Sequence, residues 1–389
     1  MRIFLLSFCC AATILLAGCS DGTNSVGNKL INPNEKYVIA DTTLFAVRDT
    51  VFNVASVNGY GGSSIAGHTA DLDAKAWLRF LAASIPDSLK SCTIDTVQLY
   101  FTVSYTWSAP ASPAAYEIRE ALSGWTQAGA TRDSLPSLQI GTTVLGRITD
   151  TLSLNREVVV MLDSSTVRRW FTFVNDATQP ATYGYVIVPQ PGRTTGAFGF
   201  LPSTATTGFP KLVVHYYSAN GTRDSLTFSS SEDTFIASAN VTTTSDLEVR
   251  AGVSTWSKLQ FNVSGLAKAA IINNASLELT QKSASTLLGV GTPDSVYAYI
   301  SKAGGIPSSI DSTYRLLGTR KANTGSVDPV YVFTVTPYIQ FLIAAGTPYD
   351  GIVLHAAYNN MSVDHMVFSS SKDPDVTKRP RLLVTSSTK

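Results

Sequence analysis

The second half of this 389-residue chain repeats, in order, a set of landmarks found in the first half. A Gly-led apolar run, a Phe-containing turn and a final strand-like run starting with Pro occur twice. They lie at residues 183–188, 198–203 and 210–215, and again at residues 350–355, 366–371 and 380–385. Each copy is far longer than the unit of a solenoid, so each is expected to bury a core of its own. The sequence therefore predicts two similar domains in tandem.

Further landmarks extend the repeat towards the N-terminus of each copy. Asp49-Thr50 corresponds to Asp233-Thr234, and other pairs are 78–80 with 259–261, 94–101 with 272–279, 116–118 with 297–300, and 167–170 with 338–341. An Asn-Gly pair at 220–221 supplies a turn signal where the copies join. We therefore expect domains at 38–217 and 223–386, joined by a linker at 218–222.

Short runs of alternating apolar and polar residues, separated by Gly, Pro, Asn and Asp, fill both copies. This pattern is typical of successive strands in a β-sandwich or barrel. Helical spacing is rare, and its best candidates are 165–173 and 336–345, at equivalent places in the two copies. We predict an all-β protein with two tandem jelly-roll-like β-sandwich domains.

The N-terminus predicts an exported lipoprotein. Arg2 is followed by a short apolar stretch and then by Leu-Ala-Gly-Cys ending at Cys19. The stretch is too short to span a bilayer and is typical of a signal peptide. Leu-Ala-Gly-Cys resembles a bacterial lipobox, which implies a signal peptide at 1–18, an acylated Cys19 and, from its composition, a flexible tether within 19–37. The alternative is a plain signal peptide. A serine after Cys19 favours the outer membrane or cell surface.

Charge and cysteine content narrow the range of partners and of stabilising bonds. The net charge of +1 predicts no general attraction to nucleic acid. Cys9 and Cys10 leave with the predicted signal and Cys19 is taken by lipid, so Cys92 remains alone and no disulfide is expected within the mature chain. Cys92 itself is expected to be a structural thiol at the entry to a strand.

The ordered landmarks resemble the DNRLRE-type domain, which is related to a carbohydrate-binding module described from alginate-degrading systems. The resemblance rests on Leu78-Arg79-Phe80, Ile85-Pro86, Trp125-Thr126, Trp170, Gly184 and Pro210-Lys211-Leu212 in the first copy, and on their counterparts in the second. It covers almost the whole mature chain and implies a jelly-roll sandwich. The second copy departs from it, because Gln260 replaces the arginine and nothing matches Trp125.

A sugar-binding module needs exposed aromatic rings beside polar groups. The candidates in the first copy are Trp107, Tyr105, Trp125 and Tyr60, with Arg79 as a partner for uronate carboxylates. Tyr116 in the first copy and Tyr297, Tyr299 and Tyr358 in the second are further candidates. Packing in the core is the alternative for the tryptophans, and an internal ion pair is the alternative for Arg79.

Asp49 and Asp233 recur at the start of the two copies. They are expected either to cap a turn by accepting hydrogen bonds from backbone amides or to bind a structural Ca²⁺ ion. The histidines His68, His215, His355 and His365 form no metal-ligand spacing, and no acid/base set for catalysis is evident. We therefore expect no enzymatic activity and no cofactor.

Three functions remain open. The first is a cell-surface lipoprotein that binds polysaccharide without catalysis. The second is a structural or adhesive envelope protein whose sandwiches dock another protein. The third and weakest is a polysaccharide-degrading enzyme.

Overall fold

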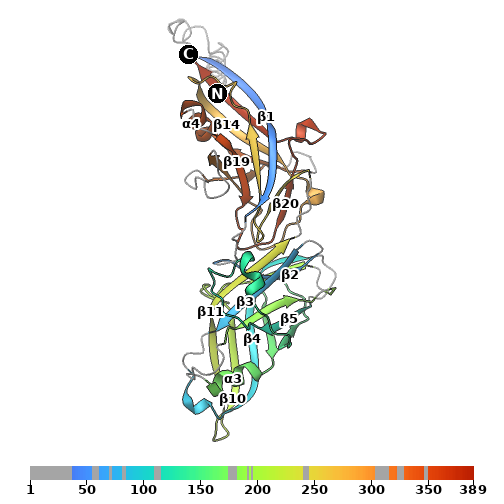
Figure 1. Cartoon of the computed structure of the whole chain (residues 1–389), viewed down its shortest axis with the longest axis vertical. Helices are drawn as coiled ribbons and strands as arrows, with labels where there is room; N and C mark the ends of the chain where they lie inside the picture. The colour runs from blue at the N-terminus through green and yellow to red at the C-terminus, as the bar shows by residue number, and fades with distance from the viewer. Residues whose placement is uncertain are drawn as a thin grey trace, which may run out of the picture.

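In a computed structural model, the chain is described over residues 37–389 apart from 55–60, 70–71, 81–84, 109–114, 174–181, 191, 194–195, 240–244, 303–314, 322–327 and 346–348. The predicted all-β class is confirmed, because the strands form two large antiparallel sheets. The halves of the molecule that these sheets build are stacked along its long axis (Figure 1). In the described part of the chain the α-helices are α3 (Ser165–Phe173) and α4 (Thr336–Ala345), and both have the predicted bounds.

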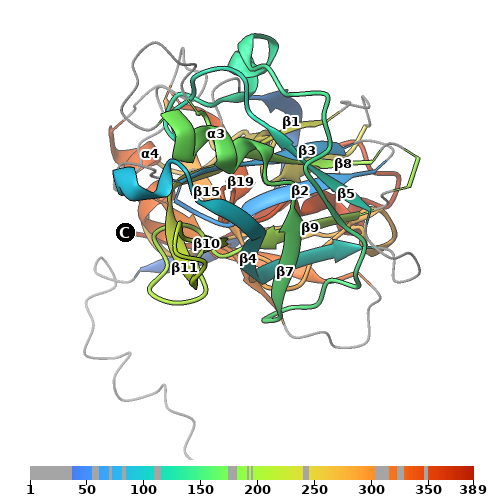
Figure 2. The ribbon, with the colours of Figure 1, turned by 90° about the horizontal axis from the view of Figure 1, so that it is seen from below.

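The first sheet has ten strands and follows the order β11-β10-β4-β9-β2-β3-β8-β5-β6, with β7 beside β4. Its strands are β2 (Ser64–His68), β3 (Leu72–Phe80), β4 (Thr93–Ser108), β5 (Tyr116–Glu120), β6 (Gly146–Ile148), β7 (Glu157–Leu162), β8 (Tyr185–Pro189), β9 (Gly196–Phe200), β10 (Lys211–Tyr217) and β11 (Arg223–Ala239). Figure 2 looks along the long axis onto this half, with α3 lying across one side of the strands.

The second sheet has eleven strands and follows the order β16-β15-β19-β13-β1-β21-β14-β18-β17, with β12 beside β13 and β20 beside β12. Its strands are β1 (Val38–Asn53), β12 (Leu247–Arg250), β13 (Thr255–Phe261), β14 (Ile271–Thr280), β15 (Val296–Lys302), β16 (Leu316–Leu317), β17 (Thr319–Arg320), β18 (Val330–Thr334), β19 (Tyr349–Ala356), β20 (His365–Phe368) and β21 (Arg381–Thr388).

The two sheets share one pairing scheme. The strand β11 pairs with β10 through its first half and with β3 through its second half. The strand β1 pairs in the same way with β21 and then with β13. The predicted equivalence holds to the residue at this point, since Asp233 lies opposite Leu78 and Asp49 lies opposite Leu259.

The first strands of the two copies are exchanged. The strand β1 begins the first copy in sequence but completes the second sheet, and β11 begins the second copy but completes the first. Figure 1 shows β1 running along the half that also contains β14, β19 and the C-terminus. The sheets therefore do not follow the predicted division at 218–222, because one sheet is built from residues 64–239 and the other from residues 38–53 together with 247–388.

A tight hairpin accounts for the place of β11. The amide of Ser218 donates to the carbonyl of Thr222, and Gly221 has a φ of +82°, which a glycine adopts without steric cost. This turn holds β11 directly against β10, the strand before it. The predicted linker is thus a hairpin loop inside the first sheet, and the equivalent position in the second sheet is left for β1.

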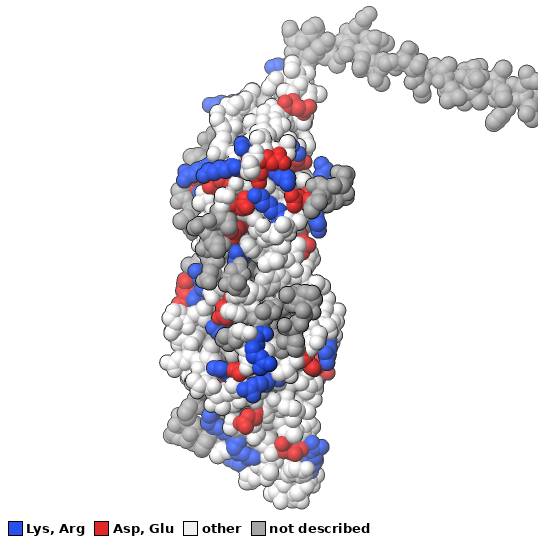
Figure 3. Space-filling model, turned by 90° about the vertical axis from the view of Figure 1, so that its right-hand side faces the viewer, with Lys and Arg blue, Asp and Glu red and all other residues white. Residues whose placement is uncertain are grey.

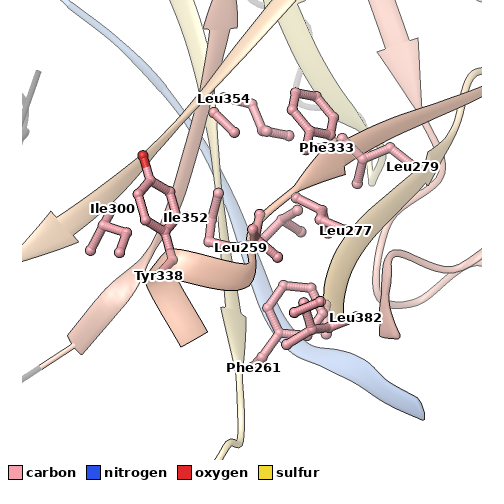
Figure 4. Close-up of a cluster of buried hydrophobic side chains, with 14 of the residues drawn as sticks. Leu259, Phe261, Leu277, Leu279, Ile300, Phe333, Tyr338, Ile352, Leu354 and Leu382 are labelled. Carbon is pink, nitrogen blue, oxygen red and sulfur yellow. The ribbon is translucent and has the colours of Figure 1, made fainter. Parts of the chain in front are cut away.

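Long strands pass between the layers of each half. Register shifts interrupt β1 between Ala46 and Arg48, β11 between Ser230 and Glu232, and β4 between Val103 and Tyr105. Such bulges bend a strand, so that its two ends can serve two packed layers. One large cluster of buried apolar side chains fills each half, and we refer to the halves as the first and second sandwich. Figure 4 shows the cluster of the second sandwich around Leu259, Leu277 and Phe333.

Candidate functional site

Three of the predicted binding residues of the first copy are buried aromatic side chains. Trp107 is 8 % exposed, Tyr105 0 % and Trp125 5 %, so their ring faces are covered by protein. A pyranose can stack only on a ring face that reaches solvent. The structure therefore does not bring Trp107, Tyr105 and Trp125 together as an open platform. Tyr60 and the lipidation candidate Cys19 lie outside the described residues.

Tyr105 joins the two sandwiches. Its hydroxyl donates to Oδ1 of Asp364 at 2.8 Å and accepts from the amide of Val363 at 3.3 Å. The amide of Gly289 donates to the same carboxylate oxygen at 2.7 Å. Burial and the carboxylate of Asp364 raise the pKa of Tyr105 well above its usual value, which keeps the phenol protonated as a donor. Tyr105 thus forms a buried, hydrogen-bonded contact between the sandwiches.

Trp125 belongs to a segment that covers the outer face of the first sandwich. Its ring packs edge-on against Trp77 of β3, with ring centroids 5.9 Å apart, and its indole N–H donates to the carbonyl of Tyr183 at 2.7 Å. Residues of the segment 121–140, which includes the 3₁₀ helix η4 (Arg132–Ser137), pack with Trp77 in one apolar cluster. This face is therefore closed by the chain itself.

Arg79 is held by the same cluster. Its guanidinium lies 4.9 Å from the ring centroid of Trp125, pairs with Glu232 at 3.0 Å and donates to the carbonyl of Trp125. An arginine with these partners has its charge and several of its donors already engaged within the protein. The internal ion pair, which the sequence left as the alternative, describes Arg79 as it lies here.

Asp49 and Asp233 have equivalent environments in the two sandwiches. Asp49 accepts from the amide and the hydroxyl of Ser371, at 2.8 and 2.9 Å. Asp233, 1 % exposed, accepts from the amide of Ser203 at 2.7 Å and from the hydroxyls of Ser203 and Ser64. Each aspartate thus fastens the exchanged strand to the turn before the final strand of its sandwich. No cluster of three or more potential metal-binding side chains occurs in the described part of the chain.

An aromatic row crosses four strands on the outer face of the second sandwich. Phe52 of β1 lies opposite Trp256 of β13, and Tyr297 of β15 lies opposite His355 of β19. The register between β13 and β19 brings Trp256 beside His355, where the two rings stack with centroids 4.9 Å apart and planes 22° from parallel. The four side chains are partly exposed. We call Phe52, Trp256, His355 and Tyr297 the aromatic row.

Tyr299 holds the imidazole of His355 in place. The two rings stack with centroids 4.9 Å apart, and Nε2 of His355 lies 2.8 Å from the hydroxyl of Tyr299. Nδ1 of His355 lies 2.7 Å from the carbonyl of Ala356. Burial and, to a smaller extent, the charge of Arg315 lower the pKa of His355 to about 4, although the contact with Ala356 opposes the shift. The imidazole is therefore neutral at pH 7.

Charged and polar groups border the aromatic row. The guanidinium of Arg315, an exposed residue, lies 4.3 Å from the ring centroid of Tyr297. On the same face of β13, Lys258 pairs with Asp350 at 2.9 Å, and Gln260 donates to the backbone carbonyl of Asp350. Aromatic faces beside a cation and hydrogen-bonding groups suit a ligand with apolar ring faces and acidic or hydroxyl substituents.

Sequence reasoning named Tyr297 and Tyr299 but missed Trp256, Phe52 and Arg315. The alternation in Thr255–Phe261 was the available signal, because it places Trp256, Lys258 and Gln260 on one face and the core residues on the other. What the alternation could not show is that β1 from the other end of the chain lies beside β13.

Comparison with known proteins finds no matching family model and no matching curated protein. Among the described residues, no helix combines the length and apolar character required to cross a bilayer.

Figure 3 shows one side of the molecule, on which positive and negative side chains are interspersed without a broad area of a single sign.

Proposed function

We propose that the protein is a lipid-anchored, non-catalytic binding module of the cell surface and that the aromatic row holds polysaccharide. The observation that carries this proposal is the stack of Trp256 on His355, continued by Phe52 and Tyr297 across four neighbouring strands. His355 itself lies between the rings of Trp256 and Tyr299, so successive sugar residues would stack on the partly exposed rings of Phe52, Trp256 and Tyr297, since each pyranose offers an apolar face. Export and anchoring come from the sequence of the N-terminus.

The charge beside the row favours an acidic polysaccharide. Arg315 is the exposed cation next to the row, and a guanidinium can bind a uronate carboxylate through two parallel hydrogen bonds. His355 adds no charge at pH 7, because its lowered pKa leaves it neutral. A chain of uronic acids therefore fits this face better than a neutral glucan. The resemblance to alginate-type modules points in the same direction.

The test is a binding measurement on immobilised polysaccharides, acidic and neutral, with protein that starts after Cys19. Trp256→Ala and Arg315→Ala are expected to weaken binding to the acidic polymer at least about fivefold, in line with about 1–3 kcal/mol for a lost stacking or charged contact. Tyr100→Ala is the matched control, because Tyr100 also lies under a cation, Lys211, at 4.9 Å but outside the row. Failure of the unmodified protein to bind any polysaccharide would remove this function.

A structural role as a stalk is the second candidate, and the exchanged strand favours it. The 16 residues of β1 span about 50 Å at the usual rise of a strand, and β1 leads to β2 in the first sandwich. A force between a lipid anchor at Cys19 and the first sandwich would pass along the backbone of β1. The second sandwich would then not lie in the path of the load.

Single-molecule pulling tests the stalk. With one handle at residue 20 and one on the first sandwich, we expect the first unfolding step to release segments between residues 64 and 239 and to leave the second sandwich folded on β1. A fluorescent label in the second sandwich that reports its unfolding before any segment of residues 64–239 is released would contradict the stalk, and it would leave the polysaccharide proposal untouched.

A further inference from the structure

One end of the second sandwich carries a cluster of exposed apolar side chains. They are Tyr37 at 55 % exposure, Val38 at 65 %, Ile39 at 69 %, Ile271 at 50 % and Phe341 at 44 %. Ile39 and Ile271 lie opposite the same residue, Ser387 of β21, from its two sides. The helix α4 is held at this end because the side chain of Gln340 accepts from the amide of Ile272 at 2.7 Å. We call these five residues the apolar tip.

At the matched end of the first sandwich Tyr217 is 40 % exposed, but the residues on its two sides are polar. Arg223 and Thr93 lie opposite Tyr217, the residue that corresponds to Ser387, and so occupy the positions of Ile39 and Ile271. Arg223 also forms an ion pair with Asp95 at 2.7 Å.

The helices at the two ends differ in the same way, with a charged residue at one end and an apolar residue at the other. Arg168 of α3 donates to the carbonyl of Cys92 just before β4, and Gln340 of α4 donates to the carbonyl of Ala270 just before β14. The next residue is Arg169 in α3 and Phe341 in α4, so the helices match one residue away from the pairing of 167–170 with 338–341 that the sequence predicted. Three matched positions are therefore polar or charged at one end and apolar at the other.

The two ends lie at opposite extremes of the molecule. In Figure 1, α3 and β10 lie at one extreme of the long axis, while α4, β14 and the C-terminus lie at the other. The apolar tip is thus the end from which residues 20–36 lead to Cys19. The composition of these 17 residues predicts a flexible chain with a root-mean-square length of roughly 23 Å. An acyl anchor at Cys19 would therefore hold the tip at about that average distance from a bilayer.

We infer that the apolar tip is a membrane-contact surface, which rests on the lipid bilayer that holds the predicted anchor and directs the first sandwich away from it. Apolar and aromatic side chains at the headgroup boundary add affinity in proportion to the area that they bury. Exposed Lys268, three residues before Ile271, suits the same boundary, because its ammonium can reach the headgroups. The inference depends on the predicted anchor and is independent of polysaccharide binding.

The experiment holds the chain at a bilayer without requiring natural lipidation. Protein starting at Ser20 with an N-terminal His-tag is bound to phosphatidylcholine vesicles that contain a nickel-chelating lipid. A nitroxide is attached to Ile39→Cys or, as the matched control, to Arg223→Cys. The remaining thiol, Cys92, is 3 % exposed and escapes labelling in the folded protein. Both target positions are exposed, so the fold should tolerate the labels, and circular dichroism checks this.

On vesicles, we expect the ratio of oxygen to chromium-oxalate accessibility to rise severalfold for the label at residue 39 and to stay constant for the label at residue 223. Equal, water-like accessibility of both labels on vesicles would overturn the inference. Immobilisation of the label at residue 39 without vesicles would also overturn it, because residues 20–36 would then cover the tip. A separate Cys19→Ala variant in cells tests the anchor, so the two failures can be told apart.

Discussion

The two sandwiches use one pairing scheme but differ in how it is completed and in what lies on its outer face. The first sandwich takes its closing strand from a hairpin with the neighbouring strand, whereas the second takes it from the opposite end of the described chain. The first covers its outer sheet face with the segment around Trp125, whereas the second has the partly exposed aromatic row on the matched strands. A duplicated scaffold can thus keep its core while its surfaces diverge.

Removal of β1 should produce the largest difference in stability between the two sandwiches. Deletion of residues 38–53 takes away both ladders that β1 makes, with β21 and with β13, and exposes the cluster around Leu259 and Leu382. We expect the second sandwich to unfold while residues 64–239 stay folded. Hydrogen exchange followed by mass spectrometry should show lost protection in β13 and β21 and retained protection in β3 and β8.

A synthetic peptide of residues 37–54 supplies the control. Added in excess to the deleted protein, it should restore protection in β13 and β21, because the exchanged strand needs no covalent link to the first sandwich to pair. Uniform loss of protection in both sandwiches would instead show that they fold as one cooperative unit.

Substitution of a tryptophan on the outer face of each sandwich should have the second largest effect on the free energy of unfolding. Trp77 is 0 % exposed beneath the segment around Trp125, so Trp77→Ala should lower the free energy of unfolding by about 3–5 kcal/mol. Trp256 is partly exposed, and Trp256→Ala should cost about 1 kcal/mol in the same urea titration. Equal losses would mean that the face of the second sandwich is as tightly covered as that of the first.

Loss of the hydrogen bond between Tyr105 and Asp364 should have a smaller effect on the free energy of unfolding. Tyr105→Phe removes a donor from the buried carboxylate of Asp364, which should cost about 2 kcal/mol in the free energy of unfolding. Tyr116→Phe is the matched control, because Tyr116 is also buried but its hydroxyl lies 3.4 Å from the carbonyl of Gly196. If the Tyr105 variant loses no more stability than the control, the hydrogen bond between Tyr105 and Asp364 contributes little to the free energy of unfolding.

The sequence contained the class of fold and the repeat, and these were predictable for a physical reason. Alternation of apolar residues sets which face of a strand is buried, and Asp49 and Asp233 mark the same register position in two copies. Even the bounds of α3 and α4 followed from the local pattern.

Which strand completes which sandwich could not be read from the sequence. Because β1 and β11 carry Asp49 and Asp233 at the same register position, their shared pattern does not say which sheet each strand joins, and the hairpin at Gly221 is what places β11 beside β10. The burial of Trp107 and Tyr105 was hidden for a similar reason. These side chains are covered in part by Val253 and Val363 of the other sandwich, and local alternation says nothing about packing between sandwiches.

The smallest predicted effect concerns His355 and the dependence of stability on pH. Its pKa is lowered to about 4 in the folded protein, chiefly by burial, against about 6.5 in the unfolded chain. As the pH drops from 6.5 towards 4, the unfolded chain binds the proton first, so the contribution of His355 to the free energy of unfolding falls. Below pH 4 this contribution changes no further. The upper limit is about 1.4 kcal/mol per pH unit, and partial exposure of the ring reduces the expected total to about 1 kcal/mol.

His355→Phe isolates this contribution, because phenylalanine keeps an aromatic ring in the row but does not titrate. Urea titrations of both proteins at pH 7 and pH 4.5 give the difference, which should show the unmodified protein losing about 1 kcal/mol more than the variant on acidification. The matched position in the first sandwich is Val188, which has no proton to bind. This pH dependence should therefore appear in the exchange protection of β13 and β19 and be absent from β3 and β8; an equal response in both sandwiches would assign it to groups other than His355.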